Sequence, residues 1–406
     1  MTTDSRFVVV GGGLAAAKLA EALRANDFDG TITLIGAEER LPYERPPLSK
    51  QHLQGKQALT DFTVDTPEWY RDHRVDLLLG STVTAVDRTT KTVALPDGST
   101  LPYDKLALAT GSRPRRPPLP GADAAGVHVL RTIDDSDALI ELFGSARRLA
   151  IIGAGWIGLE VAASARAAGL EVTVVETAPV PLHAALGDEM GEVFADLHRE
   201  HGVDLRCGAQ VAEIVTADGR ATGVRLADDT VLAADAVLLA VGARPNVELA
   251  ADAGLAVDGG VLVDESLATS DPDIVAVGDI AAHQHPVLGR RIRVEHWANA
   301  LNQPAVAALT MLGRDAVYDR LPYFFTDQYD LGMEYTGHVA PDQDARVVVR
   351  GDLGAREFVA FWLTPDNRVL AGMNVNVWDV TDRIKDLILA QRPIDPARLT
   401  DTSEDL

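Results

Sequence analysis

Two stretches of the chain repeat the same order of apolar and glycine-rich segments, and this repeat constrains the fold more than any other feature. The first, "RFVVVGGGLAAAKLAEALRANDFDGTITLIGAEE", runs from Arg6 to Glu39, and the second, "RLAIIGAGWIGLEVAASARAAGLEVTVVE", runs from Arg148 to Glu176. Each reads as an apolar strand, a glycine turn, an amphipathic helix and a second strand. Parallel strands need such a helical crossover, so the sequence predicts an α/β protein with two Rossmann-like domains.

The glycines of each repeat indicate a bound dinucleotide. Gly11, Gly13 and Ala16 fit the pattern G-x-G-x-x-A, with Leu14 and Ala15 opening the helix. The first glycine allows a tight turn and the second lets a pyrophosphate approach the backbone, which places the phosphates at the helix N-terminus. Glycine turns also occur for steric reasons alone, but a strand before and a helix after favour the dinucleotide. The second repeat carries a full G-x-G-x-x-G pattern in Gly153, Gly155 and Gly158, with Ile157 inside it.

The carboxylate that ends the second repeat predicts the nicotinamide cofactor. Glu176 can accept hydrogen bonds from both ribose hydroxyls of an adenosine and would repel a 2′-phosphate. No arginine follows it in "ETAPVPLH", so NADH is favoured over NADPH. The alternative is a solvated residue at a strand end.

Two dinucleotide folds in one chain predict two dinucleotides, and FAD with NAD is the favoured pair because a flavin can take a hydride and return electrons singly. Three more strand ends carry candidate contacts: Ala109-Thr110-Gly111, Gly242 in "LLAVGARPN", and Gly278-Asp279 in "DPDIVAVGDIA". The last reads as strand, Gly-Asp, helix. That geometry lets the Asp279 carboxylate reach a flavin ribityl hydroxyl, and a helix N-cap is the compatible alternative.

Composition narrows the function further. The net charge of −23 argues against nucleic acid and anionic membranes as partners. The single cysteine, Cys207, excludes an intramolecular disulfide and a Cys-x-x-Cys pair, and we expect it to be a small buried side chain. No signal peptide or membrane-spanning apolar run is visible, so a cytoplasmic protein is expected. We expect no metal site.

The motifs GGGLAA, PYERPPLSK, ATGSRP, GAGWIGLE, VGARPN and AVGDIA occur in an order that resembles the flavoprotein pyridine-nucleotide oxidoreductases of glutathione-reductase-like architecture. PPLSK, with "VEHWANALNQ" and "PYFFTDQYDLGMEYTG", is similar to the oxygenase-coupled ferredoxin reductases. That resemblance covers essentially the whole chain. It implies NADH reduction of FAD and electron transfer to a [2Fe–2S] ferredoxin of a cytochrome P450 or ring-hydroxylating dioxygenase, by a monomer or weak homodimer.

The resemblance also implies domain bounds. An FAD domain would comprise residues 1–112 and 241–320, an NAD domain residues 113–240, and a C-terminal α+β domain residues 321–406. The alternating apolar runs of residues 345–375 independently predict a small antiparallel sheet in the last of these.

The family pattern assigns catalytic roles to Lys50, beside the flavin ring, and to Glu160, on the first turn of the NAD helix, where it would face Lys50 and the nicotinamide carboxamide. Structural alternatives are a solvated helix-start cation for Lys50 and a first-turn dipole partner for Glu160. Trp297 is expected against the flavin, with a half-buried interface tryptophan as its alternative. Further FAD contacts implied are Arg45, near the pyrophosphate, Val83 and Arg131.

The chain departs from the family at several positions. Ala37 stands where an acidic residue usually binds the FAD ribose, so Glu38 or Glu39 is expected to replace it. Val180 and Ala184 stand where arginines usually cover the NAD adenine and phosphates, with His183 as a substitute. Phe325 stands for a second tryptophan. For ferredoxin docking, the triplet Arg290, Arg291 and Arg293 is favoured over Arg113, Arg115 and Arg116, and internal ion pairing is the alternative for both.

Two other functions stay open at this point. One is a rubredoxin or monodehydroascorbate reductase, which shares the PPLSK-type loop. The other is an apoptosis-inducing-factor-like flavoprotein with a binding role.

Overall fold

The computed structural model describes residues 5–404 and 406. The chain forms two compact units: the first comprises residues up to Glu44, then Leu59–Arg113 and Arg244–Pro322, and the second comprises Arg45–Ala58, Pro114–Ala243 and Tyr323 onward. The chain passes between the units near β8 (Ser112–Pro114) and β17 (Ala243–Pro245). Each unit is described by itself.

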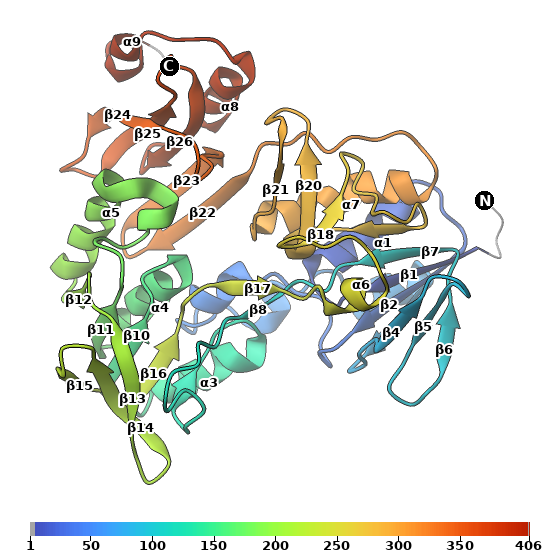
Figure 1. The fold of residues 1–406 in the computed structure, drawn as a ribbon, viewed down its shortest axis with the longest axis horizontal. Coiled ribbons are helices and arrows are strands. Elements are labelled where there is room, and N and C mark those ends of the chain that lie inside the picture. The colour runs from blue at the N-terminus through green and yellow to red at the C-terminus, as the bar shows by residue number, and fades with distance from the viewer. Residues whose placement is uncertain (1–4, 405) are drawn as a thin grey trace. The chain divides into compact units, whose positions relative to one another are not determined.

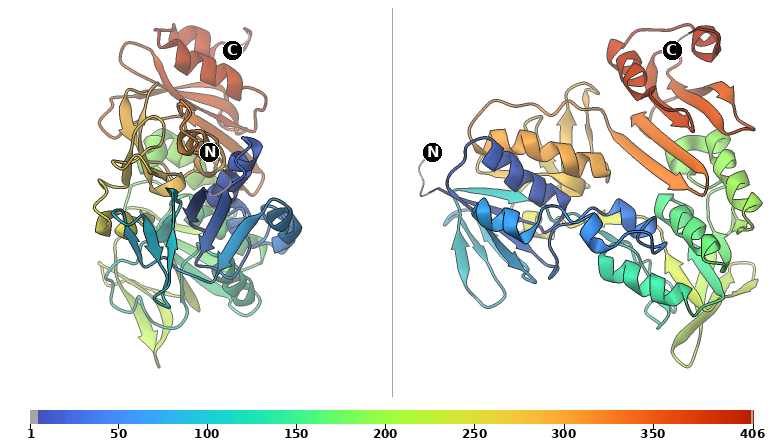
Figure 2. Two further views of the ribbon diagram at one scale, coloured as in Figure 1. Left: turned by 90° about the vertical axis from the view of Figure 1, so that its right-hand side faces the viewer. Right: turned by 180° about the vertical axis from the view of Figure 1, so that it is seen from behind.

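The first unit is built on a five-stranded parallel sheet of order β19-β7-β1-β2-β3. Its strands β7, β1 and β2 are labelled in Figure 1. Its strands are β1 (Arg6–Val10), β2 (Thr31–Gly36), β3 (Val75–Leu79), β7 (Lys105–Leu108) and β19 (Ile274–Ala276). Helices α1 (Leu14–Ala25) and α7 (Trp297–Met311) pack side by side (Figure 2). The central strands are apolar along their length because both faces of a parallel sheet are covered.

Smaller elements complete the first unit. One antiparallel sheet contains β4 (Ala85–Asp87), β5 (Thr92–Ala94) and β6 (Thr100–Pro102). Another sheet contains β18 (Val261–Val263), β20 (Ala281–His285) and β21 (Arg290–Ile292). The short helices are α2 (Pro67–Asp72), α6 (Glu248–Asp252), and the 3₁₀ turns η2 (Leu59–Asp61) and η3 (Gly278–Ile280).

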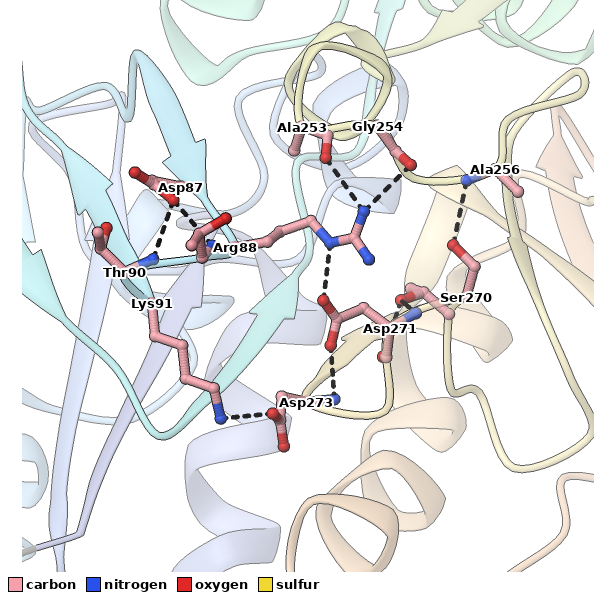
Figure 3. Close-up of polar contacts among 12 residues, drawn as sticks. Asp87, Arg88, Thr90, Lys91, Ala253, Gly254, Ala256, Ser270, Asp271 and Asp273 are labelled. Carbon is pink, nitrogen blue, oxygen red and sulfur yellow. Dashed lines mark hydrogen bonds and ion pairs between the residues drawn. The ribbon is translucent and has the colours of Figure 1, made fainter.

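Charged side chains of the loop between β4 and β5 bind the residues that precede β19 (Figure 3). Arg88 Nε lies 2.7 Å from the Asp271 carboxylate, and its Nη1 donates to the Gly254 carbonyl at 3.2 Å. Lys91 and Lys105 both pair with Asp273, and their hydrogen bonds lower the pKa of that carboxyl. These pairs hold the residues that enter β19, so the edge strand is secured at its start.

The second unit contains another parallel sheet, of order β12-β11-β10-β16-β9. Its strands are β9 (Val127–His128), β10 (Arg148–Ile152), β11 (Glu171–Val175), β12 (Asp204–Arg206) and β16 (Ala236–Leu239), with helices α3 (Ile133–Phe143), α4 (Trp156–Ala167) and α5 (His183–Glu200). A three-stranded sheet follows, made of β13 (Val211–Ala217), β14 (Arg220–Leu226) and β15 (Val231–Ala233). A capping box between Thr132 and Asp135 sets the start of α3.

The C-terminal part of this unit is an antiparallel sheet of order β22-β23-β26-β25-β24. Its strands are β22 (Tyr323–Gln328), β23 (Leu331–Gly337), β24 (Arg346–Asp352), β25 (Glu357–Leu363) and β26 (Val369–Val375), and α8 (Thr381–Ala390) and α9 (Pro396–Thr400) follow. The antiparallel sheet expected within residues 345–375 is therefore confirmed. So is the fold class: two parallel α/β sheets and a C-terminal α+β part.

Candidate dinucleotide sites and a buried lysine–glutamate pair

The turn between β1 and α1 leaves room for an anionic group. Gly11 has a φ of +145°, and a Cβ there would lie 2.2 Å from the Ala109 carbonyl oxygen, so only glycine fits. A Cβ on Gly13, in contrast, would meet no other heavy atom of the described chain within 4 Å. Within the described residues, no side chain caps α1 and no acidic residue lies in its first turn. An open, uncapped helix N-terminus fits a pyrophosphate.

Two groups of predicted FAD contacts, residues 109–111 after β7 and residues 278–279 after β19, lie at the same edge of the sheet, because the carboxyl ends of parallel β1, β7 and β19 meet there. Gly111 and Gly278 both have positive φ, at +65° and +76°. The Asp279 carboxylate accepts a hydrogen bond from the Ser112 hydroxyl at 2.6 Å. Val83 is buried in this unit's core.

The prediction of a helix after Asp279 is wrong. Gly278–Ile280 form a single 3₁₀ turn, and the chain then continues as β20, whose residues pair with β18 and β21. Strand pairing with segments on both sides outweighs the local helix signal. Asp279 is therefore not a helix N-cap.

Two acidic residues follow β2, where the sequence left the ribose ligand open. Glu38 is half-buried and its Oε2 accepts a hydrogen bond from the Tyr43 hydroxyl at 2.5 Å. Glu39 is exposed and lies against Gly80. The Tyr43 contact holds Glu38 in one orientation, and its role toward the ribose stays a prediction.

Trp297 begins α7 and is half-buried. Its Nε1 donates to Glu44 Oε2 at 3.2 Å, and its ring packs against the small cluster of Leu14, Ala17 and Val64. These contacts fix the indole against α1. The predicted contact with the flavin is not tested by them.

The second glycine turn, between β10 and α4, has the same features as the first. A Cβ on Gly153 would lie 2.4 Å from the Ala240 carbonyl oxygen, and a Cβ on Gly158 would lie 2.2 Å from that of Gly153. Gly155 faces open space among the described atoms. In that part of the chain no side chain caps α4 and its first turn holds no acid. This helix N-terminus also fits a pyrophosphate.

Glu176, directly after β11, reaches back to that turn. Its Oε2 accepts the Ala154 backbone N–H at 2.7 Å and its Oε1 accepts the Ala178 backbone N–H at 2.9 Å. The carboxylate is thus fixed beside the glycine turn and is not merely solvated. Gly242, also with positive φ (+93°), follows β16 of the same sheet.

The proline-rich segment, Arg45–Ala58, is part of the second unit and contains the 3₁₀ turn η1 (Pro46–Ser49). The Ser136 hydroxyl donates to the Leu48 carbonyl at 2.7 Å, and the Ser164 hydroxyl donates to the Ser49 carbonyl at 2.9 Å. Gln54 Nε2 also donates to the Ser164 hydroxyl. Prolines preset the turn, and helices α3 and α4 hold it in place.

The structure brings the two predicted catalytic residues together. Lys50 Nζ lies 2.8 Å from Glu160 Oε1, and both side chains are less than 8% exposed. The Ser49 hydroxyl donates to Glu160 Oε2, and Lys50 Nζ lies 5.6 Å from the centroid of the Phe325 ring. Lys50 is therefore not a solvated cation.

One detail of Glu160 is corrected. Helix α4 begins at Trp156, so Glu160 lies in its second turn, and the interpretation as a first-turn dipole partner is wrong. The second turn faces Ser49 and Lys50, which explains the burial of the carboxylate.

The structure also places the other residues that the sequence singled out. Arg131 donates its backbone N–H to Asp135 Oδ2 at 2.9 Å, and its carbonyl accepts from the Arg45 guanidinium. His183 Nδ1 lies 2.7 Å from Asp188. Cys207 is half-buried, which corrects the expectation of a buried side chain, and its burial raises the pKa of the thiol. Sequence reasoning did not identify Ser49 or Thr326, whose hydroxyls both contact Glu160.

Two open, uncapped glycine turns, each on a parallel sheet, define a protein that binds two dinucleotides. Residues 5–303 match the family model described as pyridine nucleotide-disulphide oxidoreductase, and residues 323–406 match the reductase C-terminal model. The chain belongs to the pyridine nucleotide-disulphide oxidoreductase family and carries its reductase C-terminal domain. It is an oxidoreductase that uses FAD and NAD(H), as the two turns allow.

Individual relatives match over nearly the whole length. The ferredoxin–NAD(+) reductase component of the anthranilate 1,2-dioxygenase system of Burkholderia cepacia is 42% identical, with 97% of each chain covered. Putidaredoxin reductase of Pseudomonas putida is 39% identical, over 99% of this chain and 96% of that one. Among solved structures, the covalent putidaredoxin reductase–putidaredoxin complex gives a TM-score of 0.94 at 38% identity, covering 99% and 97% of the two chains.

Proposed function

We propose that this protein is the NADH:ferredoxin reductase of an oxygenase system, with a [2Fe–2S] ferredoxin as its electron acceptor. The observation that carries the proposal is the full-length similarity to relatives named as the ferredoxin–NAD(+) reductase component of a dioxygenase system, rhodocoxin reductase and putidaredoxin reductase. We also propose that it acts in the cytoplasm as a monomer or weak homodimer. No helix in the described part of the chain has the length and apolar character to cross a membrane.

The chain's own residues divide the work. The N-terminus of α1, opened by Gly13, would hold the FAD pyrophosphate, and Asp279 would hold a ribityl hydroxyl. The N-terminus of α4 and Glu176 would hold NADH, whose 2′-phosphorylated form the carboxylate would repel. Bound FAD supplies the redox chemistry, since it accepts a hydride and returns electrons singly. Lys50 would stabilise negative charge that develops on the flavin, and Glu160 would orient the nicotinamide carboxamide.

The other two candidate functions differ in their electron acceptor. A rubredoxin or monodehydroascorbate reductase would pass electrons to those acceptors faster than to a ferredoxin. A flavoprotein with a binding role would form a long-lived NAD-bound reduced state with no acceptor activity. The similarity to ferredoxin reductases extends over nearly the whole chain, and it therefore favours a ferredoxin reductase over these two alternatives.

The deciding experiment is NADH-driven cytochrome c reduction by the purified yellow protein, with and without [2Fe–2S] ferredoxins. We expect fast reduction only when a ferredoxin is present. Equal rates without a ferredoxin, or a rubredoxin that outperforms every ferredoxin tested, would contradict the proposal.

The arginines proposed for ferredoxin docking are not equivalent. Arg113 pairs with Glu248, Arg291 donates to the Val263 carbonyl at 2.7 Å, and Arg293 pairs with Glu295. These three therefore have internal partners, as the structural alternative for both triplets held. Arg115 and Arg116 are exposed. We propose that this exposed pair contributes to the attraction of an acidic ferredoxin.

A further inference from the structure

Buried polar side chains continue from Glu160 Oε1, the same carboxylate oxygen that Lys50 contacts. The Thr326 hydroxyl lies 2.6 Å from Glu160 Oε1, and Gln328 Nε2 lies 3.2 Å from the Thr326 hydroxyl. The amide oxygen of Gln328 lies 2.9 Å from His198 Nε2, and the Tyr329 hydroxyl lies 3.3 Å from His198 Nδ1. Strand β22, Tyr329 directly after it and helix α5 of the second unit thus bring four side chains into one continuous series of hydrogen bonds that ends at Glu160.

The chemistry of these groups fixes the direction of every hydrogen bond. An ionised carboxylate only accepts, so the single hydroxyl proton of Thr326 points to Glu160. Thr326 must then accept from Gln328, which directs the amide N–H₂ toward Thr326 and the amide oxygen toward His198. His198 must donate through Nε2–H, and its Nδ1 is left to accept from the Tyr329 hydroxyl.

Burial keeps this arrangement consistent. Thr326, Gln328 and His198 are each no more than 1% exposed. Burial of the His198 imidazole lowers its pKa to about 4, so the ring is neutral near pH 7 and Nδ1 can accept. Tyr329, at the far end, is half-buried and stacks on the His201 ring at 3.7 Å between ring centroids.

We propose that Thr326, Gln328, His198 and Tyr329 form a directed donor chain whose function is to position the Glu160 carboxylate between Lys50 and the nicotinamide. Apolar side chains of suitable shape would fill the same volume at less desolvation cost, so a fully paired polar chain leading to one carboxylate indicates a role in its orientation. Hydrogen bonds in such a chain polarise one another, and the strongest effect falls on the last donor, Thr326. This inference rests on the proposed function, since it assigns Glu160 to the hydride-transfer step.

The matched variants are Thr326→Val, which removes the hydroxyl at nearly constant volume, and Thr326→Ser, which keeps it. A charge-assisted hydrogen bond is worth enough to predict a roughly 10- to 100-fold slower flavin reduction at saturating NADH in Thr326→Val, and rescue to within a few-fold of the parent in Thr326→Ser. Thr336→Val is the control, because Thr336 is a buried threonine of the same sheet that is not a member of the proposed donor chain. It should leave the rate unchanged. Tyr329→Phe, farthest from Glu160, should have the smallest effect.

A second measurement does not depend on catalysis. In the ¹⁵N-histidine-labelled holoenzyme, the coupling pattern of His198 should report the Nε2–H tautomer near pH 7. The Nδ1–H tautomer would overturn the donor chain, and so would a Thr326→Ser enzyme as slow as Thr326→Val. If ferredoxin transfer is absent but both tautomer and Thr326 results hold, the proposed acceptor is wrong while the donor chain stands.

Discussion

Replacing Lys50 by methionine tests the buried pair most directly. The change leaves the Glu160 carboxylate buried with the hydroxyls of Ser49 and Thr326 as its remaining donors. Removal of one member of a buried ion pair typically costs about 3–5 kcal/mol, and two retained donors place the expected loss in the free energy of unfolding at about 3 kcal/mol. Loss of a charge-stabilising group from a preorganised site should also slow flavin reduction roughly 10²- to 10³-fold.

The double variant Lys50→Met/Glu160→Gln separates the two effects. It removes both charges, so its stability should return to within about 1 kcal/mol of the parent, because a buried pair is often replaced by neutral groups at little cost. Its rate of flavin reduction should stay low, because the catalytic charge is still absent.

The assays are urea unfolding of the FAD-loaded protein, followed by tryptophan fluorescence, and stopped-flow bleaching of the flavin by NADH. The four proteins of the double-mutant cycle give the coupling energy between the two side chains. A single variant that loses less than about 1 kcal/mol, or a double variant less stable than both single variants, would refute the reasoning from a coupled buried pair.

Four further predictions concern other residues. Glu176→Ala should erode the preference for NADH over NADPH, measured as the ratio of kcat/KM; an unmodified enzyme that uses NADPH equally well would contradict the ribose assignment. Cys207→Ser should leave NADH-to-ferredoxin turnover nearly unchanged, and a folded but inactive variant would overturn the mechanism. Arg115→Gln/Arg116→Gln should raise the KM for ferredoxin and flatten its salt dependence without changing flavin reduction by NADH; unchanged turnover at low salt would place docking elsewhere. His283 is 1% exposed, neither ring nitrogen has a hydrogen-bond partner within the described chain, and burial lowers its pKa to about 4. Because the unfolded histidine binds a proton near pH 6.5, the free energy of unfolding should fall as the pH drops from that value toward 4. His283→Phe should reduce the slope of this free energy against pH by up to about 1.4 kcal/mol per pH unit, as measured in unfolding curves.

Some features of this protein follow from short segments and could be predicted. The two glycine turns could be recognised from their own residues, because Gly11 and Gly153 adopt a positive φ that other residues rarely adopt. The apolar strand before each turn and the amphipathic helix after it are recorded in local periodicity. The roles assigned to Lys50 and Glu160 came from resemblance to a family, and the structure adds their 2.8 Å contact.

Other features depend on residues far apart in sequence, and no local pattern records them. Asp279 lies in a 3₁₀ turn because β20 pairs on both of its sides, although the segment itself reads as a helix start. The proline-rich segment packs on α3 and α4, more than 80 residues later in the chain. Glu160 accepts a hydrogen bond from Thr326 of β22, 166 positions away, and Gln328 of the same strand contacts His198 of α5. The sequence by itself determined the two nucleotide-binding turns. A buried polar side chain must find its partners wherever the tertiary fold places them, so only the tertiary structure decided which side chains hold the Glu160 carboxylate.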